Sequence, residues 1–412
     1  MKNFIAHTDK TRQEMLNVLS CSSVEDLFKQ VPIKFNKFEM GDALSEMETQ
    51  KRVKSLAKKN CIEYASFLGG GVYNKFIPAC VGYIAQRFEF LTAYTPYQPE
   101  ISQGTLQIIY EYQTMISRLT GMDIANASMY DGGSACAEAI LMSHRIARGK
   151  KNKALVSNKL NPEYKEVIKT YCWAENIEIE WFDALPSTCE KYCCVMVQNP
   201  DYYGELSEII KTDTLLIVVA NLSALSIIEP PREADIVVGD IQPLGISMSF
   251  GGPHAGYMAC KEAYMRQMPG RLIGKTVDSD GKTAYTLTIQ TREQHIKREK
   301  ATSNICSNQS LIALSATLYL SLLGERGFKQ TGIISANLAH LLSTKLAEKG
   351  VKTLNTNFFN EFVIEVNDSE KFLAKLKNKM ILGGIKLDKN RILVCTTEMN
   401  TEEEILEYIS AI

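Results

Sequence analysis

The stretch Thr214-Leu-Leu-Ile-Val-Val-Ala220 decides the fold of this chain. Every residue after Thr214 is apolar, so the stretch lacks the alternation that marks a strand with one face in water. Short apolar runs lie before and after it, and helical patterns separate some of them. This order predicts βαβ units and an α/β fold with a mainly parallel sheet flanked by helices. The expected strands are 154–157, 177–182, 194–197, 214–220, 236–238 and 255–259, and the expected intervening helices are 162–174 and 204–211.

The segment before the sheet has a mostly helical pattern from residue 20 to 68. Ser22 or Ser23 is the expected cap of a helical turn at 24–28, and a charged periodic stretch follows at 44–57. Three glycines, 69–71, then form a turn, because they would cost too much backbone entropy inside a helix. We interpret residues 1–68 as a helical N-terminal arm.

The segment after the sheet predicts a second, smaller domain. A long helix is expected from Gln309 to Leu323, ended by Gly324 and Gly327, and a further helix precedes a change of pattern at Gly350. Beyond Gly350 the pattern alternates between strand and helix. The expected elements are 359–366, 369–380, 391–396 and 401–412. We therefore predict a large domain at 69–325 and a small C-terminal α+β domain at 326–412.

Composition excludes several classes of protein. The 412 residues include 46 Lys and Arg against 47 Asp and Glu, so the chain offers no positive field for nucleic acid. The 11 cysteines are odd in number and lack a Cys-x-x-Cys pair, which favours reduced thiols in a cytoplasm. Charged residues near the N-terminus and the lack of a long apolar stretch predict neither a signal peptide nor a membrane span.

Two loops are candidates for a site. In Ser128–Ala139, a glycine turn at Asp131, Gly132 and Gly133 precedes a helix of small residues, where free N–H groups suit a phosphate, although an ordinary capped loop explains it as well. In Thr92–Gly104, two tyrosines, two prolines and several amides form a stiff loop that suits a site or a surface turn.

A third candidate is the segment from Thr291 to Asn308. Its charged first half has the pattern of a solvated helix face. Thr302, Ser303 and Asn304 then offer hydroxyl and amide donors for an anion. His254 and His295 have no Cys, His or carboxylate partner at metal-ligand spacing, so no metal site is predicted.

Several longer stretches carry a specific resemblance. The chain closely resembles the P-protein family of the glycine cleavage system, in particular the subunit 1 type of the two-subunit glycine dehydrogenase (decarboxylating). The resemblance runs essentially from end to end. The stretches that carry it are Ala93-Tyr-Thr-Pro-Tyr-Gln-Pro-Glu-Ile-Ser-Gln-Gly-Thr105, Glu111-Tyr-Gln-Thr-Met115, Asn126-Ala-Ser-Met-Tyr-Asp-Gly132, Arg266-Gln-Met-Pro-Gly-Arg271, and Gln290-Thr-Arg-Glu-Gln-His295 with Glu299-Lys-Ala-Thr-Ser-Asn-Ile-Cys306.

The resemblance implies the fold-type I architecture of pyridoxal-phosphate transferases, with active sites at a dimer interface. It also implies a reaction that decarboxylates glycine and passes the aminomethyl group to the lipoyl arm of H-protein, in an α2β2 heterotetramer whose subunit 2 holds the cofactor. By analogy with the fold, the residues that line the partner's site are Tyr94, Thr95, Tyr97, Gln98 and Glu100, and those that approach the phosphate of its cofactor are Thr302, Ser303 and Asn304.

The sequence allows a check on whether this chain or subunit 2 binds pyridoxal phosphate. A pyridoxal-phosphate enzyme needs a lysine for the Schiff base and usually a carboxylate for the pyridinium nitrogen. The interval from Thr212 to Cys260 has no lysine, and Asn221 ends the strand where the family pattern predicts Asp. We therefore predict no catalytic residue in this chain. The vestigial cofactor positions would be Asp131, Gly132, Gly133, Asn221 and Gln242.

Two other interpretations remain open. The chain could be a non-catalytic scaffold that stabilises subunit 2 or recruits H-protein. It could also be a self-sufficient pyridoxal-phosphate enzyme of another specificity, which would require a different chain trace that brings another lysine to the cofactor. The lysines available for that trace are Lys261, Lys275 and Lys282. The stretch from Gly383 to Arg391 is also shorter than is usual for the family.

Overall fold

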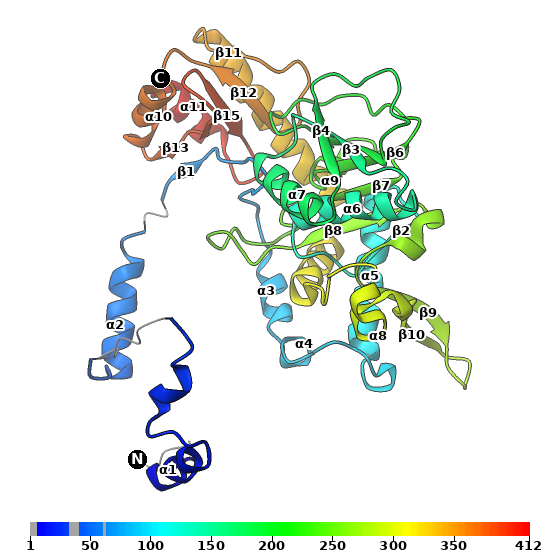
Figure 1. Ribbon diagram of the computed structural model, residues 1–412. Coiled ribbons are helices and arrows are strands. Elements are labelled where there is room, and N and C mark those ends of the chain that lie inside the picture. Colours follow the sequence, from blue (N-terminus) through cyan, green and yellow to red (C-terminus); the bar gives the residue numbers. More distant parts are fainter. Residues whose placement is uncertain (1–5, 33–40, 61–62) are drawn as a thin grey trace. The chain divides into compact units, whose positions relative to one another are not determined.

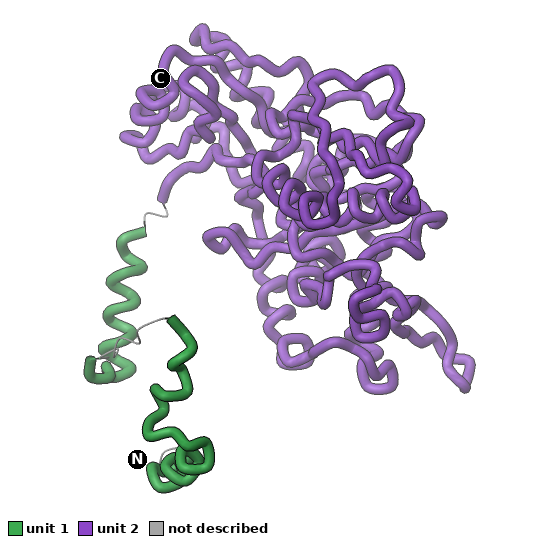
Figure 2. Tube along the Cα trace, viewed as in Figure 1, with its two compact units in different colours: residues 1–62 green, residues 63–412 purple. Residues whose placement is uncertain are grey.

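The structure is a computed structural model that describes residues 6–32, 41–60 and 63–412. The chain forms two units, 1–62 and 63–412 (Figure 2). The first unit contains the helices α1 (Asp9–Val18), η1 (Val24–Phe28) and α2 (Glu46–Ala57). Ser23 caps η1 through a capping box, as expected, and Ser45 caps α2 in the same way.

A seven-stranded sheet of described residues lies in the second unit, in the order β2-β8-β7-β6-β5-β3-β4 (Figure 1). The pairs formed by β8 are antiparallel and the other pairs are parallel, so the prediction of a mainly parallel sheet is confirmed. The strands are β2 (Ile124–Ala125), β3 (Lys153–Ser157), β4 (Glu178–Phe182), β5 (Cys194–Asn199), β6 (Leu215–Ala220), β7 (Ile236–Asp240) and β8 (Gly256–Cys260).

Strand β6 is buried on both faces, which explains its unbroken apolar sequence. Leu216 and Val218 belong to a hydrophobic cluster with residues of α5 and α9, whereas Ile217 and Val219 belong to one with residues of α6 and α7. Two helical layers therefore cover the sheet (Figure 1). These helices are α5 (Gln103–Thr120), α6 (Gly132–Ile146), α7 (Pro162–Ala174) and α9 (Ser310–Glu348).

The prediction of a helix at 204–211 is wrong. The Asp201 carboxylate accepts hydrogen bonds from the N–H groups of Tyr203 (2.9 Å) and Glu205 (3.0 Å), and Gly204 adopts a left-handed conformation (φ 87°). Glu205 then pairs with Phe358 in an isolated β-bridge. These contacts fix the backbone in a turn and an extended segment, which overrides the helical pattern of the sequence.

The predictions of a helix ended at Gly324 and of a further helix before Gly350 are confirmed, because α9 consists of two helices that meet at a kink; only the expected break at Gly327 is wrong. Gly324 has non-helical backbone angles (φ 59°), so the helix is interrupted there, as expected. It continues after the break, and Gly327 lies inside the second part. The helical backbone is therefore interrupted at Gly324 alone and resumes directly after it.

The C-terminal part has its own four-stranded sheet, in the order β11-β12-β15-β14, and its own hydrophobic cluster. The expected order of strand, helix, strand and helix is confirmed by β12, α10, β15 and α11. The bounds are β11 (Lys352–Thr353), β12 (Glu361–Glu365), α10 (Ser369–Lys377), β13 (Ile381–Leu382), β14 (Ile385–Lys386), β15 (Arg391–Cys395) and α11 (Glu402–Ser410). The division into domains at 68/69 and 325/326 stays a prediction.

Other elements were not expected from the sequence. They include α5 and the antiparallel hairpin of β9 (Leu272–Val277) and β10 (Thr283–Thr288). The remaining elements are β1 (Ala65–Ser66), α3 (Ala79–Ala85), α4 (Phe88–Leu91), η2 (Pro99–Ile101), η3 (Ala224–Ser226), η4 (Glu262–Gln267), η5 (Gln290–Arg292), α8 (Gln294–Lys297) and η6 (Arg298–Lys300). Among the described helices, none combines the length and the apolar character needed to cross a bilayer.

Candidate functional site

The carboxyl ends of β5, β6 and β7 meet the N-terminus of α6 at one edge of the large sheet. Open α/β sheets bind ligands at such an edge. Here the edge encloses a cavity of about 40 Å³, far below the roughly 300–1,000 Å³ of ordinary ligand pockets. The residues around it are Gly71, Tyr73, Asn161, Tyr164, Gln198, Val219, Ala220, Asn221, Gly239, Asp240 and Pro243.

The N-terminus of α6 is bonded within the chain. Asp131 caps the helix by accepting the N–H of Ser134 at 2.7 Å. Asp240, the last residue of β7, accepts the N–H of Gly132 at 3.2 Å and that of Gln242 at 2.7 Å. A carboxylate of the chain thus lies where a phosphate would bind to the first turn of the helix.

Tyr164 of α7 fills further space beside the same turn. A Cβ atom on Gly132 would lie 2.3 Å from the Tyr164 hydroxyl oxygen, so only glycine fits there. A Cβ atom on Gly133 would lie 3.1 Å from a methyl group of Val167. The two glycines therefore let α7 pack closely against α6 and leave no concave cradle above the turn.

Asp240 is half-buried, and desolvation of its carboxyl raises the pKa of that group to about 6. The N–H groups of Gln242 and Gly132 and the nearby His254 act in the opposite direction, because they favour the ionised form. The carboxylate is thus ionised at neutral pH and supplies the negative charge that the helix terminus favours.

The other two vestigial positions serve the protein's own backbone. The Gln242 amide accepts the N–H of Tyr73 at 2.9 Å and donates to the carbonyl groups of Tyr73 and Ile246, both at 2.8 Å. The Asn221 side chain accepts the N–H of Ser223 at 2.9 Å. These groups stabilise two turns at the edge of the sheet.

The site at this edge does not fit pyridoxal phosphate. The cavity is too small, Asp240 and Tyr164 fill the phosphate position, and no lysine lies between Thr212 and Cys260. Lys261 directly follows β8 and lies beside the start of β7, at the edge of the sheet opposite to the candidate site. Its ammonium group pairs with the buried Asp235 at 3.1 Å. No step of a reaction is therefore assigned to a cofactor held by this chain.

A second cluster joins the candidate loop at 92–104 to the segment at 291–308. Arg271 is buried (4% exposed), and its guanidinium donates to the Asn308 amide oxygen at 3.1 Å and to the Cys306 carbonyl at 3.0 Å. It also donates to the Tyr97 hydroxyl at 3.5 Å and lies 5.6 Å from the centre of that ring. Arg271 therefore ties both loops to β9.

Two further residues complete this cluster. The Glu293 carboxylate lies 3.9 Å from Arg271 Nε and 3.8 Å from His295 Nδ1. The ring of His295 meets the ring of Tyr97 edge to face, with 5.4 Å between their centres. The structure thus brings Tyr97 together with a cation, a carboxylate and an imidazole, whereas Tyr94 is 86% exposed and takes no part in this cluster.

The other predicted site residues of the two segments, 92–104 and 291–308, differ in exposure. Gln98 and Glu100 are exposed, whereas Thr95 is half-buried. Thr302 and Ser303 are half-buried and Asn304 is exposed. Contrary to the expected solvated face, Arg292 in the charged half is buried and donates to the carbonyl groups of Met268 and Gly270.

Sequence reasoning missed Asp240, Tyr164 and Arg271. Asp240 and Tyr164 follow no motif, because their roles depend on the approach of β7 and α7 to the start of α6. A signal for Arg271 was present, since it ends one of the stretches that carry the family resemblance.

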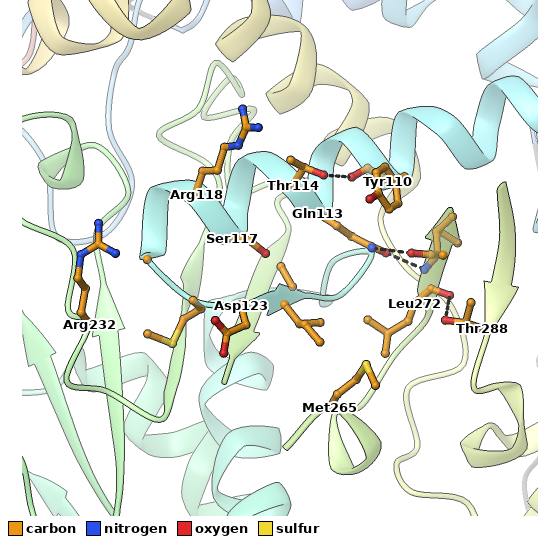
Figure 3. A pocket seen from close by; sticks show the side chains of 16 residues that line it. Tyr110, Gln113, Thr114, Ser117, Arg118, Asp123, Arg232, Met265, Leu272 and Thr288 are labelled. Atoms are coloured by element: carbon orange, nitrogen blue, oxygen red, sulfur yellow. Dashed lines mark hydrogen bonds between the residues drawn. The ribbon is translucent and has the colours of Figure 1, made fainter. Parts of the chain in front are cut away.

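A larger cleft of about 740 Å³ lies elsewhere, between α5, β2 and β9 (Figure 3). Gln113 forms two hydrogen bonds with the backbone of Ile273 there, at 3.1 and 2.9 Å, and holds β9 against α5. Exposed Arg118 and Arg232 lie at its margin. None of the residues predicted for a site lines this cleft.

Comparisons with known proteins agree with one another. Residues 2–412 match the family model of the glycine cleavage system P-protein. The probable glycine dehydrogenase (decarboxylating) subunit 1 of Geobacillus thermodenitrificans is 43% identical over 442 residues, covering 100% of this chain and 98% of that one. The protein of the same name from Listeria monocytogenes is 42% identical, with 99% and 98% covered.

Solved structures show the same likeness. A crystal structure of glycine decarboxylase (P-protein) of the glycine cleavage system, in inhibitor-bound form, superposes with a TM-score of 0.87 at 38% identity, covering 99% of both chains. The sphingosine-1-phosphate lyase of Burkholderia pseudomallei has a TM-score of 0.66 at 11% identity, covering 93% of both chains, and shows the fold alone. The predicted fold-type I architecture is thereby confirmed, and the chain belongs to the glycine cleavage system P-protein family.

Proposed function

We propose that this chain is the subunit of a two-part glycine decarboxylase that lacks the cofactor lysine, and that subunit 2 holds pyridoxal phosphate. One observation carries the proposal: the edge of the sheet where this fold holds its cofactor is closed by the chain's own Asp240 and Tyr164. The relatives named subunit 1 support a division of the enzyme between two chains.

In the proposed complex, glycine loses CO2 and its aminomethyl group passes to the lipoyl arm of H-protein. The assembly is an α2β2 heterotetramer in the cytoplasm. A reduced compartment is consistent with the ten described cysteines, all of which have free thiols.

This chain contributes surface to the site of its partner. Tyr94, Thr95, Tyr97, Gln98 and Glu100 line that site, and partner contact covers the apolar side chains that the segment leaves exposed, such as Ile101 (81% exposed). Covering them would exclude water from the reacting groups and strengthen the electrostatic contacts there.

Mixing the two subunits tests the proposal directly. The isolated chain should show no absorbance of a lysine-linked cofactor and no glycine–CO2 exchange, and addition of subunit 2 should produce both. Borohydride reduction should trap pyridoxyl-lysine on subunit 2 alone. A trapped pyridoxyl-lysine on this chain would contradict the proposal and favour a self-sufficient enzyme.

A second prediction concerns Tyr97. The Tyr97→Ala variant should lower glycine–CO2 exchange by the complex about tenfold or more, because the loop loses the ring that meets Arg271 and His295. Trp173→Ala on α7 removes another exposed aromatic side chain and should leave exchange unchanged. Gel filtration should show an intact complex in both cases. Normal exchange with Tyr97→Ala would favour the scaffold interpretation.

A further inference from the structure

A buried carboxylate in α6 has no role in the two clusters described above. Glu138 is 2% exposed, and its neighbours along the helix, Ala137 and Ala139, are buried as well. Its Oε1 accepts a hydrogen bond from the Ser303 hydroxyl at 2.7 Å, whereas its Oε2 has no partner among the described residues. Burial raises the pKa of Glu138, and the Ser303 hydroxyl and Arg145 partly oppose this. Such a buried group costs free energy, so a passive core position would be better filled by an apolar residue.

Ser303 connects Glu138 to a loop. Its hydroxyl donates to Glu138 and also accepts the N–H of Ile305 at 3.0 Å. One oxygen thus joins α6 to the loop and bends the loop back on itself. The neighbouring amides are held as well, since Thr302 N–H donates to the Arg292 carbonyl at 2.9 Å and Cys306 N–H donates to the Tyr130 hydroxyl at 2.8 Å.

This arrangement leaves two successive amides free. The N–H groups of Ser303 and Asn304 have no acceptor in the part of the chain that the structure describes. Consecutive free N–H groups in a bent loop form a concavity that suits an anion. The Ser303 hydroxyl is already used within the chain, so the loop would offer these backbone groups, together with Thr302 and Asn304, to a phosphate.

We propose that Glu138 is a positioning residue, which holds the Ser303 hydroxyl and so shapes residues 302–305 to present two backbone N–H groups to the phosphate of the partner's cofactor. The inference rests on the proposed function, because the phosphate belongs to subunit 2. Glu138 acts through Ser303 and touches no reacting atom.

Cofactor binding by the assembled complex tests this role. Subunit 2 prepared without cofactor is mixed with each variant and titrated with pyridoxal phosphate, and the absorbance of the lysine-linked form gives the dissociation constant. Ser303→Ala and Glu138→Ala should each raise it about tenfold, the effect of losing one hydrogen bond that shapes the loop. Glu138→Gln keeps an acceptor for Ser303 and should stay within about twofold of the wild type. Ser143→Ala, which removes a buried hydroxyl from the same helix, is the control.

Hydrogen exchange of the chain alone gives a second readout. Ser303→Ala should speed exchange at the amides of Ile305 and Cys306, and Ser143→Ala should not. The role of Glu138 is overturned if Ser303→Ala matches the wild type in either measurement, and this holds even if Glu138→Ala fails to fold. The proposed function is overturned separately, if mixing the wild-type chain with subunit 2 produces no glycine–CO2 exchange.

Discussion

Replacement of Arg271 by alanine is expected to lower the free energy of unfolding of the chain by about 3–5 kcal/mol and to lower its support of glycine–CO2 exchange about as much as Tyr97→Ala does. The guanidinium is buried and bonds to the Asn308 side chain and the Cys306 carbonyl, so its loss leaves these acceptors unpaired. It also removes the guanidinium that lies 3.9 Å from the Glu293 carboxylate, which is only 10% exposed. Exchange should fall because Tyr97 loses the group that fixes its hydroxyl and ring.

Two variants make this prediction specific. Arg271→Lys keeps a positive charge near Glu293 but loses the planar fork, so it should recover part of the stability and little of the exchange activity. Arg266→Ala removes an exposed arginine from the same stretch and should behave like the wild type. Chemical denaturation and isotope exchange measure the two effects. Full activity of a folded Arg271→Ala variant would show that the position of Tyr97 does not matter.

Asp240→Ala is expected to lower the free energy of unfolding by about 2–3 kcal/mol, and inorganic phosphate should restore much of it. The substitution frees the N–H groups of Gly132 and Gln242 at the start of α6, where a phosphate can replace the lost carboxylate. Phosphate should not stabilise the wild type, in which Asp240 fills this position.

Asp235→Ala is the matched control for Asp240→Ala. Asp235 is buried and lies at the other end of β7, where it pairs with Lys211 and Lys261. Its loss should destabilise the chain without any rescue by phosphate. If phosphate fails to stabilise a folded Asp240→Ala or Asp240→Ser variant, the carboxylate does not occupy an anion position.

The destabilisation caused by Asp240→Ala should also depend on pH. The pKa of Asp240 is about 6 in the folded chain against an ordinary 3.8, so between these values the folded state binds more protons than the unfolded one. The stability that Asp240 contributes is therefore complete below about pH 4 and falls as the pH rises through 6. The difference between wild type and Asp240→Ala should be larger at about pH 5 than at about pH 8, by on the order of 1 kcal/mol. An equal difference at both values would contradict a desolvated, titrating carboxylate.

Local errors of the sequence analysis came from contacts with distant residues. The helix expected at 204–211 is replaced by a turn because Asp201 binds two amides and Glu205 pairs with Phe358. The role of Ser303 near an anion stays a prediction, and the structure adds that its hydroxyl donates to Glu138. Phe358, the partner of Glu205, and Glu138, the partner of Ser303, each lie more than a hundred residues away along the chain, so no local sequence pattern reveals these contacts.

The sequence by itself determined the class of the fold and the absence of lysine from the stretch where this fold would place a cofactor lysine. The unbroken apolar run at β6 requires burial on both faces, and the absence of lysine from 212–260 is a covalent fact that folding cannot change. Only the tertiary structure decided how the edge of the sheet at the start of α6 is filled. Asp240 and Tyr164 close it because β7 and α7 converge on Gly132, and a single sequence does not reveal such a convergence of elements.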